Sequence, residues 1–206
     1  MLKKYFLHLE GMDLAGKTTT AELIAKNSGL NWKIYNNCLS ERNLIQELTK
    51  KLAERNIYDD EIYGYLHFVA LKADIKFFEL RENIIQDSTI LLRSLNYHKE
   101  AGNYELVKHF EELAKSHPRP NISIYLTASI EARRNRLNKR INEDSLKITR
   151  NDKLPMNNPE KFLKMEKSLM ELSKKYFNSI VLDTSDMTEI QTSEFIINLL
   201  REGKFR

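Results

Sequence analysis

The chain alternates between short apolar runs and longer segments in which apolar residues recur at helical spacing. The short runs, bounded by polar or turn-forming residues, are predicted as strands. They cover residues 5–10, 32–35, 88–92, 122–126 and 179–182. The helical segments cover 17–27, a stretch starting near 41, 59–86, 104–115, 130–141, 160–176 and 188–201. This alternation predicts an α/β fold of three layers, in which helices cover both faces of a five-stranded parallel sheet.

The helix predicted over 59–86 carries a long stripe of apolar residues at steps of three and four, which is predicted to face the core. The stripe consists of Ile62, Leu66, Val69, Ala73, Phe77, Leu80 and Ile84. A helix of this length has a second face to cover, so the sequence leaves open a homodimer in which that face packs against a copy of itself.

Residues 142–158 form a polar stretch with little periodicity, and they follow a strongly basic helix. The stretch carries charges of both signs and includes Pro155, with Pro159 just after it. Long loops within compact domains are usually lids or binding segments. The segment is therefore predicted to be a lid.

The composition narrows the class of protein. A chain of 206 residues suits a single domain over 1–206. The net charge of +4 suits an anionic small molecule and is too weak to indicate a nucleic-acid partner. The single cysteine, Cys38, excludes an intramolecular disulfide and a cysteine metal site. The apolar run behind Met1 to Lys4 is too short for a signal peptide or a membrane span, so we expect a cytoplasmic protein without a membrane partner.

The segment from Gly11 to Thr18 reads G-x-x-x-x-G-K-T and lies between a predicted strand and a predicted helix. In that context the pattern indicates a phosphate-binding P-loop of the P-loop NTPase fold, with successive N–H groups and the helix N-terminus facing the phosphates. Lys17 is expected to reach the β- and γ-phosphates, and the Thr18 hydroxyl to bind Mg²⁺. The residues expected to bind ATP are Gly11, Met12, Asp13, Leu14, Ala15, Gly16, Lys17, Thr18 and Thr19.

Phosphoryl transfer depends on positioning and on positive charge near the transferred group. Arg93 directly follows the predicted strand 88–92, so it is expected to point into the cleft. Arg136 and Arg140 lie four residues apart on the basic helix and therefore share a face. These three arginines and Lys17 are the predicted catalytic residues, with Arg150 of the lid as a further candidate.

The order of these features resembles the thymidylate kinases, within the wider group of nucleoside and nucleotide kinases. Glu10-Gly11-Met12-Asp13 and Gly16-Lys17-Thr18-Thr19 match the start of that family. The later segment Pro120 to Leu126 also follows the family pattern, with Arg136 and Arg140 ten and fourteen residues after the leucine. The resemblance extends over nearly the whole chain, although only the P-loop is a specific motif.

The resemblance implies a role for several residues around the acceptor. Asp13 would face the sugar hydroxyl of the acceptor, and Glu10 would lie nearby. Arg93 would hold the transferring or acceptor phosphate, and Lys72 would contact an acceptor monophosphate. Arg136, Arg140 and Arg150 would close over ATP.

The chain departs from the family after the predicted third strand. Where the family has Asp-Arg-Tyr or Glu-Arg-Ser, this chain has Leu92-Arg93-Ser94, so the acidic position is vacant unless Asp13, Glu41 or Asp74 replaces it. The polar signature that reads thymine is also absent from 95–98.

A monophosphate acceptor has an anionic oxygen and needs no strong base, so the leading hypothesis is ATP- and Mg²⁺-dependent phosphorylation of a nucleoside monophosphate, most like dTMP. The alternatives are a kinase for a nucleoside or another small hydroxyl compound, and a degenerate nucleotide-binding protein without turnover.

Overall fold

A computed structural model describes residues 4–143, 148 and 151–202. Their strands form one sheet in the order β2-β3-β1-β4-β5, and every neighbouring pair is parallel. The strands are β1 (Phe6–Glu10), β2 (Trp32–Asn36), β3 (Asn83–Asp87), β4 (Ile122–Thr127) and β5 (Ile180–Asp183). The predicted fold class, a five-stranded parallel sheet between two helical layers, is confirmed.

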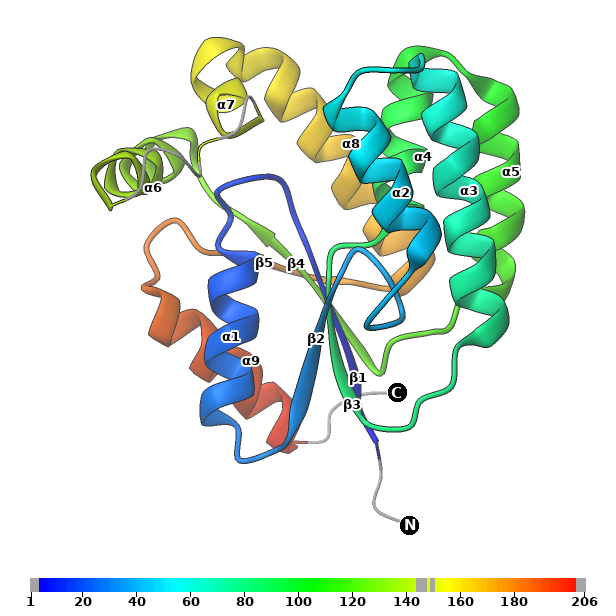
Figure 1. Cartoon of the computed structure of the whole chain (residues 1–206). Helices are drawn as coiled ribbons and strands as arrows, with labels where there is room; N and C mark the ends of the chain where they lie inside the picture. Colours follow the sequence, from blue (N-terminus) through cyan, green and yellow to red (C-terminus); the bar gives the residue numbers. More distant parts are fainter. Residues whose placement is uncertain (1–3, 144–147, 149–150, 203–206) are drawn as a thin grey trace.

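Helices cover both faces of the sheet (Figure 1). The two that pack together on one face are α1 (Lys17–Asn27) and α9 (Glu189–Glu202). The opposite layer contains α2 (Leu44–Glu54), α3 (Asp60–Phe77), α4 (Ile90–Ala101), α5 (Tyr104–Ser116) and α8 (Pro159–Phe177). At the carboxyl edge of the sheet lie α6 (Ile130–Glu143), the 3₁₀ turn η2 (Asn151–Lys153) and α7 (Leu154–Asn157).

The described part of the predicted lid, 142–158, comprises the end of α6, η2 and α7. Arg150, the further lid candidate, lies outside the described residues. Within the portion of the chain that the structure covers, no helix is long and apolar enough to cross a membrane.

The third strand lies five residues earlier in the sequence than the predicted strand 88–92. The strand is β3, whose polar Gln86 and Asp87 are buried because the strand pairs on both sides, with β1 and β2. The apolar run 88–92 instead spans the start of α4, where the Thr89 hydroxyl caps the helix by accepting a hydrogen bond from Leu91 N at 3.2 Å. Arg93 therefore lies on a helix and does not follow a strand.

The predicted stripe on the long helix is also wrong in its orientation. Helix α3 ends at Phe77, and the stripe residues Ile62, Val69 and Phe77 are 42%, 47% and 76% exposed. The buried positions of α3 lie on another face and include Ala70 and Leu71. Because apolar residues occupy two faces of this helix, periodicity alone selected the wrong one.

Candidate functional site

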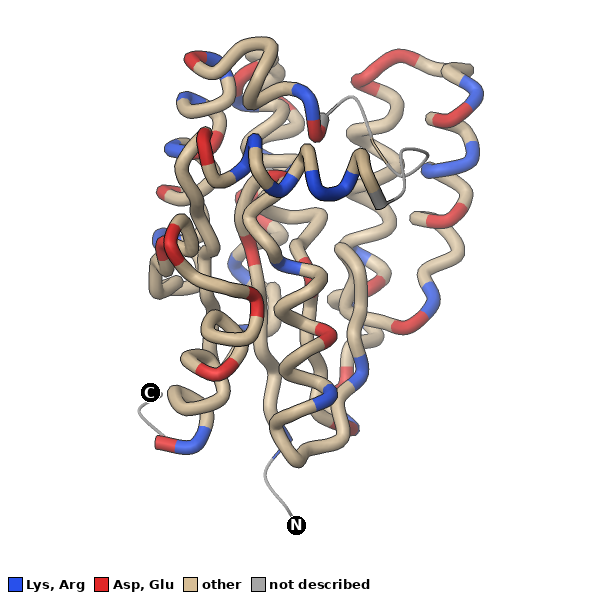
Figure 2. Tube along the Cα trace, turned by 90° about the vertical axis from the view of Figure 1, so that its left-hand side faces the viewer, with Lys and Arg blue, Asp and Glu red and all other residues tan. Residues whose placement is uncertain are grey.

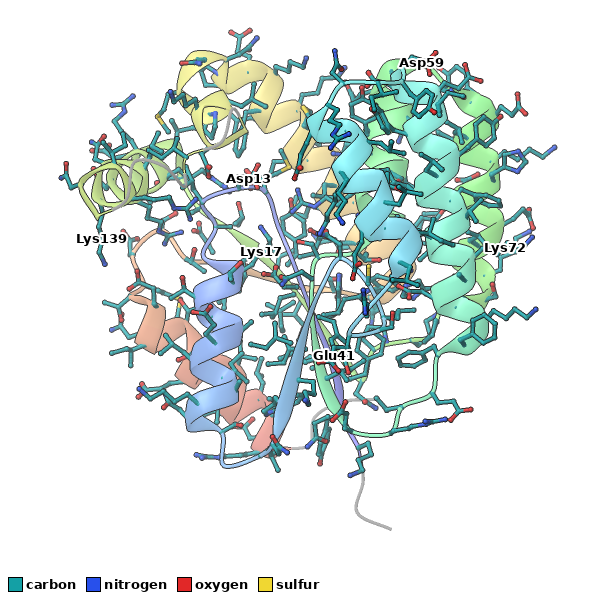
Figure 3. The ribbon with its side chains drawn as sticks, viewed as in Figure 1. Asp13, Lys17, Glu41, Asp59, Lys72 and Lys139 are labelled. Carbon is teal, nitrogen blue, oxygen red and sulfur yellow. The ribbon has the colours of Figure 1, made fainter. Side chains whose placement is uncertain are left out.

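The P-loop lies at the carboxyl end of β1 and leads directly into α1 (Figure 3). Gly11 adopts φ 145°, and a Cβ built there would lie 2.2 Å from the carbonyl oxygen of Leu126 on neighbouring β4. Gly16 adopts φ 94° at the N-cap of α1, which a side chain would strain. Both glycines are therefore required by the backbone, as the motif predicts, and the N-terminus of α1 is left to face an anion.

Lys17 lies in the first turn of α1, with its ammonium 3.2 Å from the carbonyl oxygen of Met12. The side chain is buried, and burial together with the nearby Arg93 lowers the pKa of Lys17, against the opposing influence of Asp87 and Asp13. A lysine held inside its own loop in this way is positioned to meet phosphate oxygens as they enter.

The acidic position that the sequence left vacant is occupied by Asp87, at the end of β3. Its Oδ2 accepts a hydrogen bond of 2.6 Å from the Thr18 hydroxyl. The expectation for Leu92 was therefore wrong: Leu92 lies in the core at 0% exposure and takes no part in the site.

Thr18 and Asp87 supply a hydroxyl and a carboxylate, which are the oxygen ligands that Mg²⁺ prefers. Among the described residues there is no group of three or more His, Cys, Asp and Glu side chains arranged to hold a metal. Magnesium is usually bound by one or two protein oxygens together with substrate phosphates, so this sparse pair fits the ion.

Glu10 and Arg93 form a buried ion pair beside the P-loop. Arg93 Nε donates to Glu10 Oε1 at 3.0 Å, and its Nη2 donates to the Gly11 carbonyl oxygen at 2.5 Å. The Glu10 carboxylate also accepts from the backbone N–H groups of Gly11 and Thr89 at 3.0 and 3.2 Å. Burial alone would raise the pKa of Glu10, but Arg93, His8 and Lys17 hold it at about 2. The carboxylate is therefore ionised and fully engaged.

The Arg93 side chain is 30% exposed, whereas that of Glu10 is completely buried. The Arg93 side chain is therefore partly exposed beside the P-loop, although its Nη2 also donates to the Ser88 hydroxyl at 3.2 Å. Arg93 thus reaches the P-loop from helix α4 and not from the end of a strand. Glu10 pairs with it on its buried side.

Arg136 contacts the other side of the P-loop. Its guanidinium donates to the Leu14 carbonyl oxygen at 2.9 Å, and to the hydroxyl and carbonyl of Thr184 at 3.1 and 2.5 Å. Arg140, one turn further along α6, pairs with Asp152 at 2.8 Å. Figure 2 shows the Lys and Arg residues distributed along this helix.

A cavity of about 240 Å³ opens between the P-loop, α6 and the segment after β5. Its lining residues include Gly16, Thr20, Arg136, Arg140 and Thr184. Whole small-molecule sites usually span roughly 300–1,000 Å³. This cavity therefore suits one part of a ligand whose phosphates occupy the adjoining P-loop.

A larger cavity, of about 570 Å³, lies away from the P-loop. It is lined by the outer strand β2, the start of α2 and the end of α3, and it contains none of the P-loop residues. Size alone would favour this cavity as the site, but the phosphate-binding backbone, Lys17 and Arg93 all converge elsewhere. The smaller cavity is therefore the one that adjoins the candidate site.

Arg133 and Glu166 belong to the site but were not singled out by the sequence. Arg133 lies on α6 at 0% exposure and donates to the carbonyl oxygens of Asp13 and Ala128 and to the Glu166 carboxylate. In the sequence, Arg133 differs in no way from the other arginines of the same helix. Only its burial in the folded chain distinguishes it.

Three further candidates are not brought to the P-loop. Lys72 is exposed on the outer side of α3, with its ammonium 5.9 Å from the Phe68 ring centroid, and it lies far from Lys17 in Figure 3. Asp74 is buried and accepts hydrogen bonds from Leu39 N and the Ser40 hydroxyl. Glu41 lines the larger cavity and also lies away from Lys17 (Figure 3). Asp13 remains within the loop itself.

Comparisons of sequence found no match: no protein-family model matches the chain, and no curated protein is detectably similar in sequence. Comparisons of structure found similar proteins. Thymidylate kinase from Candida albicans is similar with a TM-score of 0.67 and 16% identity, covering 99% of this chain and 95% of that one.

Two further kinases have similar structures. Deoxyadenosine kinase from M. mycoides, solved with bound dATP, has a TM-score of 0.55 and 21% identity, covering 95% of this chain and 99% of that one. Shikimate kinase from Acinetobacter baumannii, solved with shikimate, has a TM-score of 0.52 and 13% identity, covering 99% and 97%. All three are P-loop kinases, and likeness at this identity shows that the chain has the P-loop kinase fold.

Proposed function

We propose that the protein transfers the γ-phosphoryl group of ATP to a nucleoside monophosphate, most like dTMP. The observation that carries this proposal is the pairing of Arg93 with Glu10: the arginine is partly open beside the P-loop, and the carboxylate behind it is buried and ionised. An anionic acceptor needs positive charge and no general base. Arg93 supplies the charge, and Glu10, with its pKa at about 2, is a poor base.

ATP would bind with its phosphates against the P-loop backbone and its base in the cavity of about 240 Å³ beside Arg136. Lys17 would donate to the β- and γ-phosphates, since its ammonium already lies within the loop. Thr18 and Asp87 would hold Mg²⁺, which when bound offsets negative charge on the phosphates.

In the transfer step, an oxygen of the acceptor phosphate forms a bond to the γ-phosphorus. The bond between the γ-phosphorus and the β–γ bridging oxygen breaks, and ADP leaves with that electron pair. Lys17 and Arg93 would stabilise the charge that spreads over the migrating group. No covalent enzyme intermediate is required.

Transfer to a hydroxyl group, as in a nucleoside kinase, is the alternative that the similar deoxyadenosine kinase and shikimate kinase suggest. A hydroxyl acceptor requires a base. Asp74 is buried and hydrogen-bonded to Leu39 N and the Ser40 hydroxyl, and Glu41 lies away from Lys17, so the candidates are Asp13 and Asp87, the acid at the end of β3. The third hypothesis, a protein that binds nucleotide without turnover, rested on Leu92 and loses that support because Asp87 provides the acid.

Labelled ATP offered with a panel of acceptors tests the proposal. The panel comprises dTMP, the other nucleoside monophosphates, nucleosides, small hydroxy acids and no acceptor, with Lys17→Ala as the inactive control. We expect labelled diphosphate from at least one monophosphate and none from Lys17→Ala. Equal label with and without every monophosphate would refute the proposal. Label transferred to a nucleoside but to none of the monophosphates would instead establish the hydroxyl reaction.

We further propose that the protein forms a homodimer through the exposed apolar faces of α2 and α3. The supporting residues are Leu44 and Leu48 on α2, and Val69 and Phe77 on α3, which are 64%, 51%, 47% and 76% exposed. Sedimentation of the wild type and of Val69→Asp tests this. A wild type that sediments as a monomer at all concentrations would contradict it.

A further inference from the structure

Arg133 is the largest completely buried side chain of the described residues, although it lies on a basic helix at the edge of the molecule. Its Nε donates to the carbonyl oxygen of Ala128 at 2.9 Å, Nη1 donates to the carbonyl oxygen of Asp13, and Nη2 donates to Glu166 Oε1. The guanidinium carbon stands 4.7 Å from the centroid of the Phe162 ring. One side chain thus joins the end of β4, the P-loop and α8.

Glu166 is held in turn by the sheet. Its carboxylate accepts a hydrogen bond of 3.1 Å from the Thr127 hydroxyl, and its backbone carbonyl accepts one of 3.1 Å from the Tyr125 hydroxyl. Burying an arginine and a glutamate together costs desolvation energy that two well-packed apolar residues would not incur. The pair is therefore explained better by what it holds in place than by a gain in stability.

The pair contacts the P-loop next to a residue with an unusual backbone conformation. Leu14, in the middle of the P-loop, has φ 63°, which is the left-handed region that residues with a Cβ avoid. Conformations of this kind persist only where the surroundings impose them. The peptide before Leu14 is held through the Asp13 carbonyl by Arg133, and the peptide after it is held through the Leu14 carbonyl by Arg136.

Fixing the planes of both flanking peptides fixes φ and ψ of the residue between them, because each peptide is planar. In the first of these trans peptides, the N–H of Leu14 points opposite to the Asp13 carbonyl and therefore away from α6. A carbonyl held by Arg133 thus turns the adjoining N–H towards the side of the loop where phosphates are expected.

We propose that Arg133 is a positioning residue, supported by Glu166, that holds the Asp13–Leu14 peptide in the left-handed conformation needed to bind nucleotide phosphates. The inference rests on the nucleotide-binding part of the proposed function and is independent of the acceptor. Arg133 does not touch the nucleotide. It acts through the P-loop backbone, which contacts the nucleotide.

The test uses the affinity for ADP, measured by titration calorimetry, beside the free energy of unfolding in urea. Arg133→Lys keeps a charge opposite Glu166, but the three donors of a compact ammonium sit on one nitrogen and cannot span the separated oxygens that the planar guanidinium reaches. We expect it to lower the affinity for ADP about tenfold or more, whereas Arg134→Lys, at the exposed neighbouring position, leaves it within about twofold.

Leu14→Gly provides the decisive readout, since glycine adopts a positive φ without strain. We expect Leu14→Gly to restore at least half of the logarithmic loss of affinity caused by Arg133→Lys, because the loop then needs less support. A cycle of the two changes measures that coupling. Additive effects would overturn the proposal and leave Arg133 with a structural role only.

A second variant replaces the whole ion pair. Arg133→Met with Glu166→Leu removes both charges, so stability is expected to stay close to that of the wild type. Weakened ADP binding by this folded double variant supports the proposal, and wild-type affinity overturns it. A wild type that binds neither ADP nor ATP would refute the proposed function as well, which separates the two failures.

Discussion

Two arginine–glutamate pairs flank the P-loop, and each arginine donates to a carbonyl of the loop. Arg93 pairs with Glu10 and contacts Gly11, while Arg133 pairs with Glu166 and contacts Asp13. The two pairs differ in exposure: the side chain of Arg93 is 30% exposed and that of Arg133 is 0% exposed. Under the proposed function, the exposed pair would serve the substrate and the buried pair would serve the loop itself.

The two carboxylates differ in the same sense. At Glu10, Arg93 together with His8 and Lys17 outweighs burial, so the pKa of its carboxyl falls to about 2. For Glu166, burial dominates over the attraction of Arg133, and its pKa is raised. The balance between burial and the attraction of nearby groups, led by an arginine in both cases, thus decides which buried carboxylate is stabilised as an anion.

The largest effect is expected from Arg93→Lys, which keeps a charge beside Glu10 while losing the planar guanidinium. Transfer should fall about 10²–10³-fold in kcat, the usual loss when one donor to a developing charge is removed. Affinity for ADP should change little, in contrast to Arg133→Lys. Steady-state kinetics with the best acceptor, together with ADP titration, measure both quantities. If Arg93→Lys weakened ADP binding and left kcat intact, the roles of the two arginines would have to be exchanged.

The two pairs also mark how far sequence reasoning reaches. Gly11, Gly16, Lys17 and Thr18 carry their signal in local spacing, and the structure places them as one loop at the end of β1. Asp87 has a weaker local signal, an acid after Ile84 and Ile85 and shortly before a capping threonine. The neighbouring run 88–92 is more apolar, so the sequence pattern favours that run as the strand and hides Asp87.

Arg133 had no local signal at all. Its burial depends on Glu166 and Phe162, which are distant in sequence and reach it only when α8 packs beside β4. The prediction of the core-facing side of α3 is wrong for a related reason. This helix is apolar on two faces, and its packing against α4 and α5 decides which face is buried. Contacts of this kind are set by tertiary packing, which periodicity does not encode.

An intermediate effect is expected from acid, with opposite signs for the two carboxylates. The pKa of Glu10 is about 2 in the folded protein against 4.5 when unfolded. Its contribution, about 3 kcal/mol, is therefore present above pH 4.5 and lost as the pH falls towards 2. The pKa of Glu166 is raised above its unfolded value of 4.5, so its contribution to the free energy of unfolding rises as the pH falls through the folded pKa towards 4.5, a window that lies above that of Glu10.

Urea unfolding of Glu10→Gln and Glu166→Gln from about pH 3 to 7 separates these contributions, because this range extends on both sides of the ordinary pKa of a glutamate. Glu10→Gln should lower the free energy of unfolding at neutral pH and flatten its decline in acid. Glu166→Gln should remove the rise in the free energy of unfolding as the pH falls towards 4.5, because the titrating carboxyl is gone, and should leave the decline below 4.5 in place. Identical pH profiles for the two variants would mean that the pairs are electrostatically equivalent.

The smallest effect is expected from Lys72→Ala, a change at an exposed lysine that belongs to neither pair. The family resemblance assigns Lys72 to an acceptor monophosphate, but the side chain lies over Phe68 on the outer side of α3. We therefore expect kcat/KM to stay within about twofold and the free energy of unfolding within about 0.5 kcal/mol of the wild type. The same kinetic and urea measurements check this. A rise in KM for the monophosphate alone, with ADP affinity unchanged, would show that α3 turns towards the P-loop when the acceptor binds. In that case Arg93 would share the acceptor phosphate with a second cation.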